Sequence, residues 1–202
     1  MMRRCSALSF AAMRAMHIAT RNSKVMTVRS SNLADFYTCN HHLRHLSSGR
    51  VLGELVDIYR PIDERLGYAS QPMRDAVKNE RSERPFKLWT DGGSRGNPGV
   101  SGAGWVIKSP SGKKVVECYV HLGIKTNNYA EYAAAVMGME TAQTLGIKQL
   151  ILHLDSELVV RQFKGEYGVK DATLKQLHGA MSTSAEKFDS IRVQHVFRNA
   201  NK

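Results

Sequence analysis

The chain has 202 residues, of which 42% are hydrophobic, and a formal net charge of +11 at pH 7. This length allows one domain of ordinary size plus an extension, and the hydrophobic fraction is enough for a packed core. The three cysteines are odd in number and widely spaced, which excludes a disulfide framework and indicates a reducing compartment. The excess of basic residues is consistent with a polyanionic partner, although a merely soluble basic protein has the same composition.

The N-terminal 34 residues contain six basic residues and no acidic residue. Serines and small apolar residues separate the basic ones, which is the composition of a mitochondrial transit peptide. Arg14 and His17 interrupt the apolar stretch and so argue against a secretory signal or a membrane span. We expect residues 1–30 to be a transit peptide. The mature protein should then begin at about residues 20 to 35 and reside in the mitochondrial matrix. The alternative is a disordered basic tail.

Residues 31–85 carry eight basic and eight acidic residues and predict a helical extension that ends in a polar linker. Apolar residues from Leu43 to Ile58 have the spacing of one or two short amphipathic helices, too short for a core of their own. We expect this segment to dock onto a partner such as a mitochondrial ribonucleoprotein. Cys39 and its three neighbouring histidines lack the paired spacing of a zinc site, which favours a solvated helical face.

From Phe86 onward the pattern is that of an α/β layer fold. The predicted strands are residues 86–90, 102–108, 114–121, 150–154 and 191–197. The predicted helices are residues 128–145, 156–163 and 172–187. The run at 150–154 is apolar except for one histidine, as expected of a strand that is covered on both faces.

Three carboxylates occupy informative places in this pattern. Asp91 follows the first predicted strand, Glu131 lies near the start of the long helix, and Asp155 follows the fourth strand. Each has an ordinary explanation when taken alone. Asp91 fits a turn, Asp155 fits a helix cap, and Glu131 fits a capping box opened by Asn128. Two strand ends and a helix start that each deliver one acid can also converge on a divalent metal.

The segments around these acids resemble a known family. The matching segments are TDGGSRGNPG at 90–99, GAGWVI at 102–107, TNNYAEY at 126–132, DSELVV at 155–160 and GEYGVK at 165–170. They make residues 86–202 similar to a type 1 ribonuclease H domain of the compact bacterial, archaeal and plant kind. The resemblance implies a ribonuclease H-like three-layer α/β fold, with a mixed five-stranded sheet in the order 3-2-1-4-5 and flanking helices.

The resemblance also implies a metal-dependent chemistry. It makes Asp91, Glu131 and Asp155 both catalytic and metal-binding, with Asp91 bridging two Mg²⁺ ions for which Mn²⁺ can substitute. Two divalent ions about 3.5 to 4 Å apart can activate a water and neutralise the leaving oxygen of a phosphodiester. The nucleic-acid contacts that it implies are Gly92, Gly93, Ser94, Asn97, Thr126, Asn127 and Asn128. A helix-capping role for the two adjacent asparagines is compatible with these contacts.

Two features depart from the family pattern. The family has a fourth carboxylate in a motif resembling Arg-x-x-Asn-x-x-Ala-Asp, and the sequence ends at Lys202, just before the position of that Asp. We therefore expect either a domain that lacks its C-terminal end or an incomplete active site. Ile124 stands where some relatives place an arginine in a pocket for a DNA phosphate, which weakens the expectation of a strong hybrid preference.

Two functional interpretations follow. The first is an endonuclease that cleaves the RNA strand of RNA/DNA hybrids in mitochondria, and the three intact acids favour it. The second is a non-catalytic ribonuclease H-like subunit or assembly factor of a mitochondrial ribonucleoprotein such as the mitoribosome, which the extension and the missing end favour. The site rather than the fold leads us to expect the enzyme, with an RNA/DNA hybrid or structured RNA as partner and no membrane. A transposase or resolvase of the same fold fits the acids but not their Thr-Asn-Asn-x-Ala-Glu setting.

Overall fold

The computed structural model describes residues 26–30, 36–39, 77–78 and 84–197. Its strands are β1 (Met26–Ser30), β2 (Phe36–Cys39), β3 (Phe86–Gly96), β4 (Gly99–Lys108), β5 (Lys114–Lys125), β6 (Gln149–Leu154) and β7 (Ser190–His195). Its helices are α3 (Asn127–Thr144), α4 (Glu157–Phe163) and α5 (Ala172–Ala185). The helices begin and end within a few residues of their predicted bounds.

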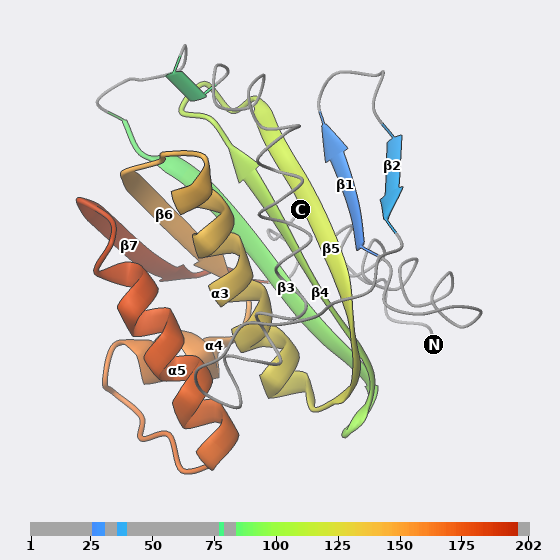
Figure 1. The fold of residues 1–202 in the computed structure, drawn as a ribbon. Coiled ribbons are helices and arrows are strands. Elements are labelled where there is room, and N and C mark those ends of the chain that lie inside the picture. The colour runs from blue at the N-terminus through green and yellow to red at the C-terminus, as the bar shows by residue number, and fades with distance from the viewer. Residues whose placement is uncertain (1–25, 31–35, 40–76, 79–83, 198–202) are drawn as a thin grey trace, which may run out of the picture.

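All seven strands belong to one sheet with the order β2-β1-β5-β4-β3-β6-β7. Strand β6 pairs in parallel with β3 and with β7, and the other neighbours are antiparallel. Counted from β3, the five strands β5, β4, β3, β6 and β7 have the order 3-2-1-4-5, which confirms the predicted mixed sheet. Figure 1 shows α3 crossing one face of this sheet, with α4 and α5 beside it.

Strands β1 and β2 extend the sheet beyond β5, where the sequence pattern predicts no strand (Figure 1). Strand β1 falls within the predicted transit peptide, and Cys39 ends β2 instead of lying on a helical face. The β-branched and aromatic residues of both segments favour strands, and β5 offers an edge that β4 leaves open to pairing. The helices predicted between residues 43 and 58 lie outside the described residues.

Strand β3 is longer than predicted and includes the glycine-rich segment. The predicted strand ends at Thr90, but pairing with β4 continues to Gly96, which lies opposite Gly99. Asp91 therefore lies inside the strand, opposite Gly104, and not at a strand end or in a turn. Glycine is unfavourable in strands on local propensity, and the paired hairpin overrides that preference here.

The hydrophobic core lies between the sheet and its helices. Fully buried members of the core are Leu88, Trp105, Tyr132, Met137, Leu152 and Leu177. Helix α3 packs closely on β3, since a Cβ on Gly138 would lie 2.9 Å from a methyl carbon of Leu88. Among the described residues, no helix is both long enough and apolar enough to cross a bilayer.

Candidate metal centre

The structure brings the three predicted acids together. Asp91 comes from β3, Glu131 from α3, and Asp155 from the residue that follows β6. One carboxylate oxygen from each lies within 4.8 Å of the others. Three elements that are far apart in the sequence thus deliver their acids to one place.

Gly92 makes this convergence possible, because it lets α3 approach the backbone of β3. A Cβ at Gly92 would lie 2.2 Å from the carbonyl carbon of Ala130 and 2.2 Å from the amide nitrogen of Glu131. No side chain fits in that space. The amide of Gly92 also donates a hydrogen bond to Oε2 of Glu131 at 3.2 Å, so the strand backbone orients the carboxylate.

The helix caps exclude two of the ordinary explanations for the acids. The N-cap of α3 is Thr126, whose Oγ1 accepts a hydrogen bond from the amide of Tyr129 at 3.2 Å. Glu131 is therefore not the partner of a capping box opened by Asn128. The N-cap of α4 is Ser156, so Asp155 does not cap that helix either.

A buried hydrogen-bond network holds α4, which begins next to Asp155, against α3. The hydroxyl of Tyr132 donates to Oε1 of Gln162 at 2.9 Å, and Nε2 of Gln162 donates to the carbonyl of Gly168 at 3.1 Å. Burial raises the pKa of Tyr132 to about 12, so this hydroxyl keeps its proton at neutral pH. The network joins the helix that carries Glu131 to the segment that follows Asp155.

The charge of the cluster fits a hard divalent cation. Asp91 is 3% exposed and Glu131 is 2% exposed, so both carboxylates are removed from most of the water. Close carboxylates repel one another, and burial strengthens that repulsion. A divalent cation removes it, and carboxylate oxygens are the ligands that Mg²⁺ and Ca²⁺ prefer. The residues present therefore suit a divalent metal.

An aromatic stack lies near Asp91, inside β3, and Asp155, which follows β6. Trp89 and His153 pair across these strands with ring centroids 4.7 Å apart, each two residues before an acid. Among the residues described, neither ring nitrogen of His153 has a hydrogen-bond partner. Burial, together with Lys87 and Lys108, lowers the pKa of His153, so its ring is neutral more readily than a free histidine.

The residues predicted to contact nucleic acid lie around the β3–β4 turn and the start of α3. Oδ1 of Asn97 accepts a hydrogen bond from the amide of Asn127 at 3.0 Å, which places the turn beside the helix. Thr126 is the N-cap, and Asn128 follows in the first turn. Gly93 borders open space, since a Cβ built there meets nothing within 4 Å. A ligand can therefore reach the strand backbone at Gly93.

Two serines form hydrogen bonds in the same region. Ser94 belongs to the predicted set, whereas the sequence pattern does not single out Ser101. The hydroxyl of Ser94 donates to the carbonyl of Lys125 at 2.9 Å, and the fully buried hydroxyl of Ser101 donates to the same carbonyl at 2.8 Å. Serine in a glycine-rich segment has no local pattern that marks such a contact. Nζ of Lys125 lies 4.7 Å from the ring centroid of Tyr129.

Comparison with known proteins establishes the family. A family model described as reverse transcriptase-like matches residues 89–202, which is more than half of the chain. The chain belongs to this family. A ribonuclease HI of Halobacterium salinarum is 37% identical over 126 residues, which are 62% of this chain and 63% of that protein. The chain therefore spans less than two thirds of this relative's length.

Solved structures agree with this assignment. The N-terminal ribonuclease H domain of a Mycobacterium tuberculosis protein, solved as a fusion with maltose binding protein, has a TM-score of 0.57 at 35% identity, covering 58% of this chain and 85% of that one. LC11-RNase H1 in complex with an RNA/DNA hybrid has a TM-score of 0.55 at 36% identity, covering 57% of this chain and 88% of that one. The fold is that of a ribonuclease H domain.

Replacing Gly92 with alanine tests the close approach of β3 and α3. The new methyl must push α3 away from the strand, which should cost about 1 to 3 kcal/mol of unfolding free energy and abolish stabilisation by divalent metal. Gly93→Ala is the matched control, because its methyl enters open space. Denaturant unfolding with and without Mg²⁺ measures both effects, and equal behaviour of the two variants would contradict the proposed contact.

Replacing Asp91 with asparagine tests the electrostatics of the cluster. The change removes one of three clustered charges at nearly constant volume, so the melting temperature without metal should stay the same or rise slightly. Added Mg²⁺ should raise the melting temperature of the unmutated protein, by preferential binding to the folded state, and raise that of the variant much less. Asp171→Asn at the N-cap of α5, where asparagine also caps well, should respond to Mg²⁺ like the unmutated protein.

Proposed function

We propose that the chain is a metal-dependent endoribonuclease that cleaves the RNA strand of RNA/DNA hybrids. The observation that carries this proposal is the convergence of Asp91, Glu131 and Asp155 from three elements to within 4.8 Å. The relative from Halobacterium salinarum, named ribonuclease HI, supports the activity. The similar structure solved with an RNA/DNA hybrid supports the substrate class.

The three acids would hold the metal, with Mg²⁺ as the proposed ion and Mn²⁺ as a substitute. A pair of such ions supplies an activated water and neutralises the leaving oxygen of the phosphodiester. The chain's own part is to hold three carboxylates in place before the ion arrives. Gly92 orients Glu131 through its amide, and the central strand carries Asp91.

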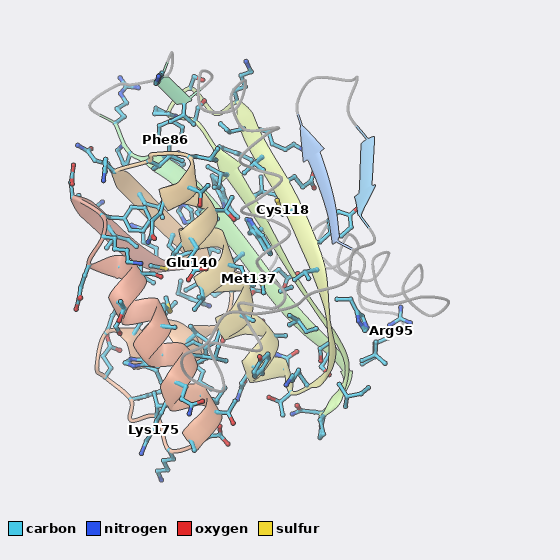
Figure 2. The ribbon with its side chains drawn as sticks, in the orientation of Figure 1. Phe86, Arg95, Cys118, Met137, Glu140 and Lys175 are labelled. Atoms are coloured by element: carbon cyan, nitrogen blue, oxygen red, sulfur yellow. The ribbon has the colours of Figure 1, made fainter. Side chains whose placement is uncertain are left out.

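The end of the β3–β4 hairpin is the proposed contact for the nucleic acid. Strand β3 runs from Phe86 to Gly96, and the side chain of Arg95 extends from this end of the hairpin (Figure 2). Arg95 and Lys125 supply positive charge for the phosphate backbone. The open space at Gly93 admits close contact of the strand backbone with 2′-hydroxyls, which distinguish RNA from DNA. No observation on the described residues favours the non-catalytic subunit.

A cleavage assay tests this function. The full chain should cleave the RNA strand of an RNA/DNA hybrid with Mg²⁺ or Mn²⁺, and should leave a DNA duplex intact. Glu131→Gln should reduce the rate by about 10²-fold or more, since a charge at the reacting centre is lost. Glu186→Gln on the exposed C-cap of α5 should retain the rate. If the unmutated protein binds metal but cleaves no hybrid, the nuclease proposal is wrong.

We also propose that the protein resides in mitochondria, because the first 34 residues are rich in arginine and contain no acid. Strand β1 begins at Met26, so processing before this residue would leave the seven-stranded sheet complete. N-terminal sequencing of the protein from purified mitochondria should give a start between about residues 20 and 26. Recovery of intact Met1 from a cytosolic fraction would contradict the proposal.

A further inference from the structure

Side-chain hydrogen bonds tie the β3–β4 hairpin to the junction between β5 and α3. The carbonyl of Lys125, the last residue of β5, accepts from Ser94 on β3 and from Ser101 on β4. Two residues later, the amide of Asn127 donates to Oδ1 of Asn97 in the turn. We call Ser94, Ser101 and Asn97 the hairpin clamp.

Ser101 is the buried centre of the clamp. Its side chain is fully buried, and its Oγ lies 2.8 Å from the carbonyl oxygens of both Gly99 and Lys125. A hydroxyl has one proton, so it donates to one carbonyl at a time or is shared between the two. Removing this hydroxyl leaves the partly buried Lys125 carbonyl with Ser94 as its remaining side-chain donor, and so loosens the tie between β4 and the end of β5.

A β-bulge brings the end of β5 to this hydroxyl. Ser101 pairs with Gly123 and Gly102 pairs with His121, so Leu122 is an extra residue on β5. Gly123 has a φ of +76°, in the left-handed region that glycine adopts most easily. Bulges bend a strand and redirect the residues that follow. The chain then leaves β5 for the N-cap of α3 directly after Lys125.

We propose that the hairpin clamp positions Glu131 for metal binding, and that Ser101 is its principal residue. The contact at Gly92 sets how closely α3 approaches β3. The clamp sets where along the strand the first turn of α3 begins, and Glu131 lies in the following turn. Ser101 is thus a positioning residue that acts through Lys125 and the helix start.

Small displacements at the helix start are sufficient to disrupt the site. A helix rises about 1.5 Å per residue, whereas Mg²⁺ demands oxygen ligands at about 2.0 to 2.1 Å in near-ideal octahedral geometry. A slip of α3 by less than one residue therefore removes Glu131 from a metal held by the other two acids. The inference rests on the metal site of the proposed function, but not on the identity of the nucleic acid.

Ser101→Ala, compared with Ser109→Ala, tests the clamp. Ser109 is the matched control, because it is also fully buried and directly follows the other end of β4. Its replacement by alanine removes one hydrogen bond between serine hydroxyls, the 2.7 Å bond to Ser111. The measurement is the apparent dissociation constant for Mg²⁺ or Mn²⁺, obtained from the dependence of the melting temperature on metal concentration. Ser101→Ala should raise the apparent dissociation constant for the metal about 10-fold, as is typical when a residue that orients a metal-coordinating side chain is removed. Ser109→Ala should match the unmutated protein.

Asn97 variants keep the test valid if Ser101→Ala does not fold, because Asn97 is exposed. Asn97→Ala removes the acceptor for the Asn127 amide and should raise the apparent dissociation constant for the metal. Asn97→Asp keeps an acceptor at a helix N-terminus, which favours negative charge, and should restore it. Asn97→Asp should also raise KM for a hybrid, because the added charge repels phosphates, while kcat is retained. This split separates positioning from nucleic-acid contact.

The outcomes distinguish the clamp from the proposed function. Unchanged metal dependence in both Ser101→Ala and Asn97→Ala overturns the clamp and leaves the nuclease proposal in place. Metal binding by the unmutated protein without hybrid cleavage overturns the nuclease proposal, and the metal titrations still decide the clamp. Absence of any metal stabilisation in the unmutated protein overturns both.

Discussion

The direct contact between the backbones of β3 and α3 is the constraint on which the rest of the site depends. Gly92 on the strand provides it, because it faces the backbone of Ala130 and Glu131, and Gly138 on the helix leaves room for the side chain of Leu88. Glu131 and Gly138 are seven residues apart, about two helical turns, and so lie on one face of α3. Because no side chain separates strand and helix at Gly92, a carboxylate on the helix can reach one on the strand.

The clustering of the three carboxylates lowers the stability of the metal-free protein but favours the binding of a divalent cation. A protein selected for stability alone has no reason to bury Asp91 and Glu131 together beside Asp155, because like charges in a region of low dielectric repel strongly. The repulsion becomes useful when a divalent cation binds, since the cluster then gains attraction from all three acids. The surrounding hydrogen bonds hold the acids near one another before any ion is present, and this preorganisation favours tight binding.

The sequence indicates the five central strands and the helices well, because each has a clear periodicity between glycine-rich or polar breaks. It misses the continuation of β3 through the glycine-rich segment, since local propensity there favours a turn and only the partner strand shows otherwise. It also misses β1 and β2, because five- and four-residue segments form strands only when an edge such as that of β5 is available.

By itself, the sequence singled out Asp91, Glu131 and Asp155 as the candidate metal-binding residues, because of their types, order and setting along the chain. The tertiary structure decided how they come together. Gly92 is an ordinary glycine until α3 is seen against it, and Ser101 is an ordinary serine until its bond to Lys125, 24 residues away, is known. The reason is physical: periodicity and capping depend on neighbours along the chain, whereas close approach and buried hydrogen bonds depend on residues that only the fold brings into contact.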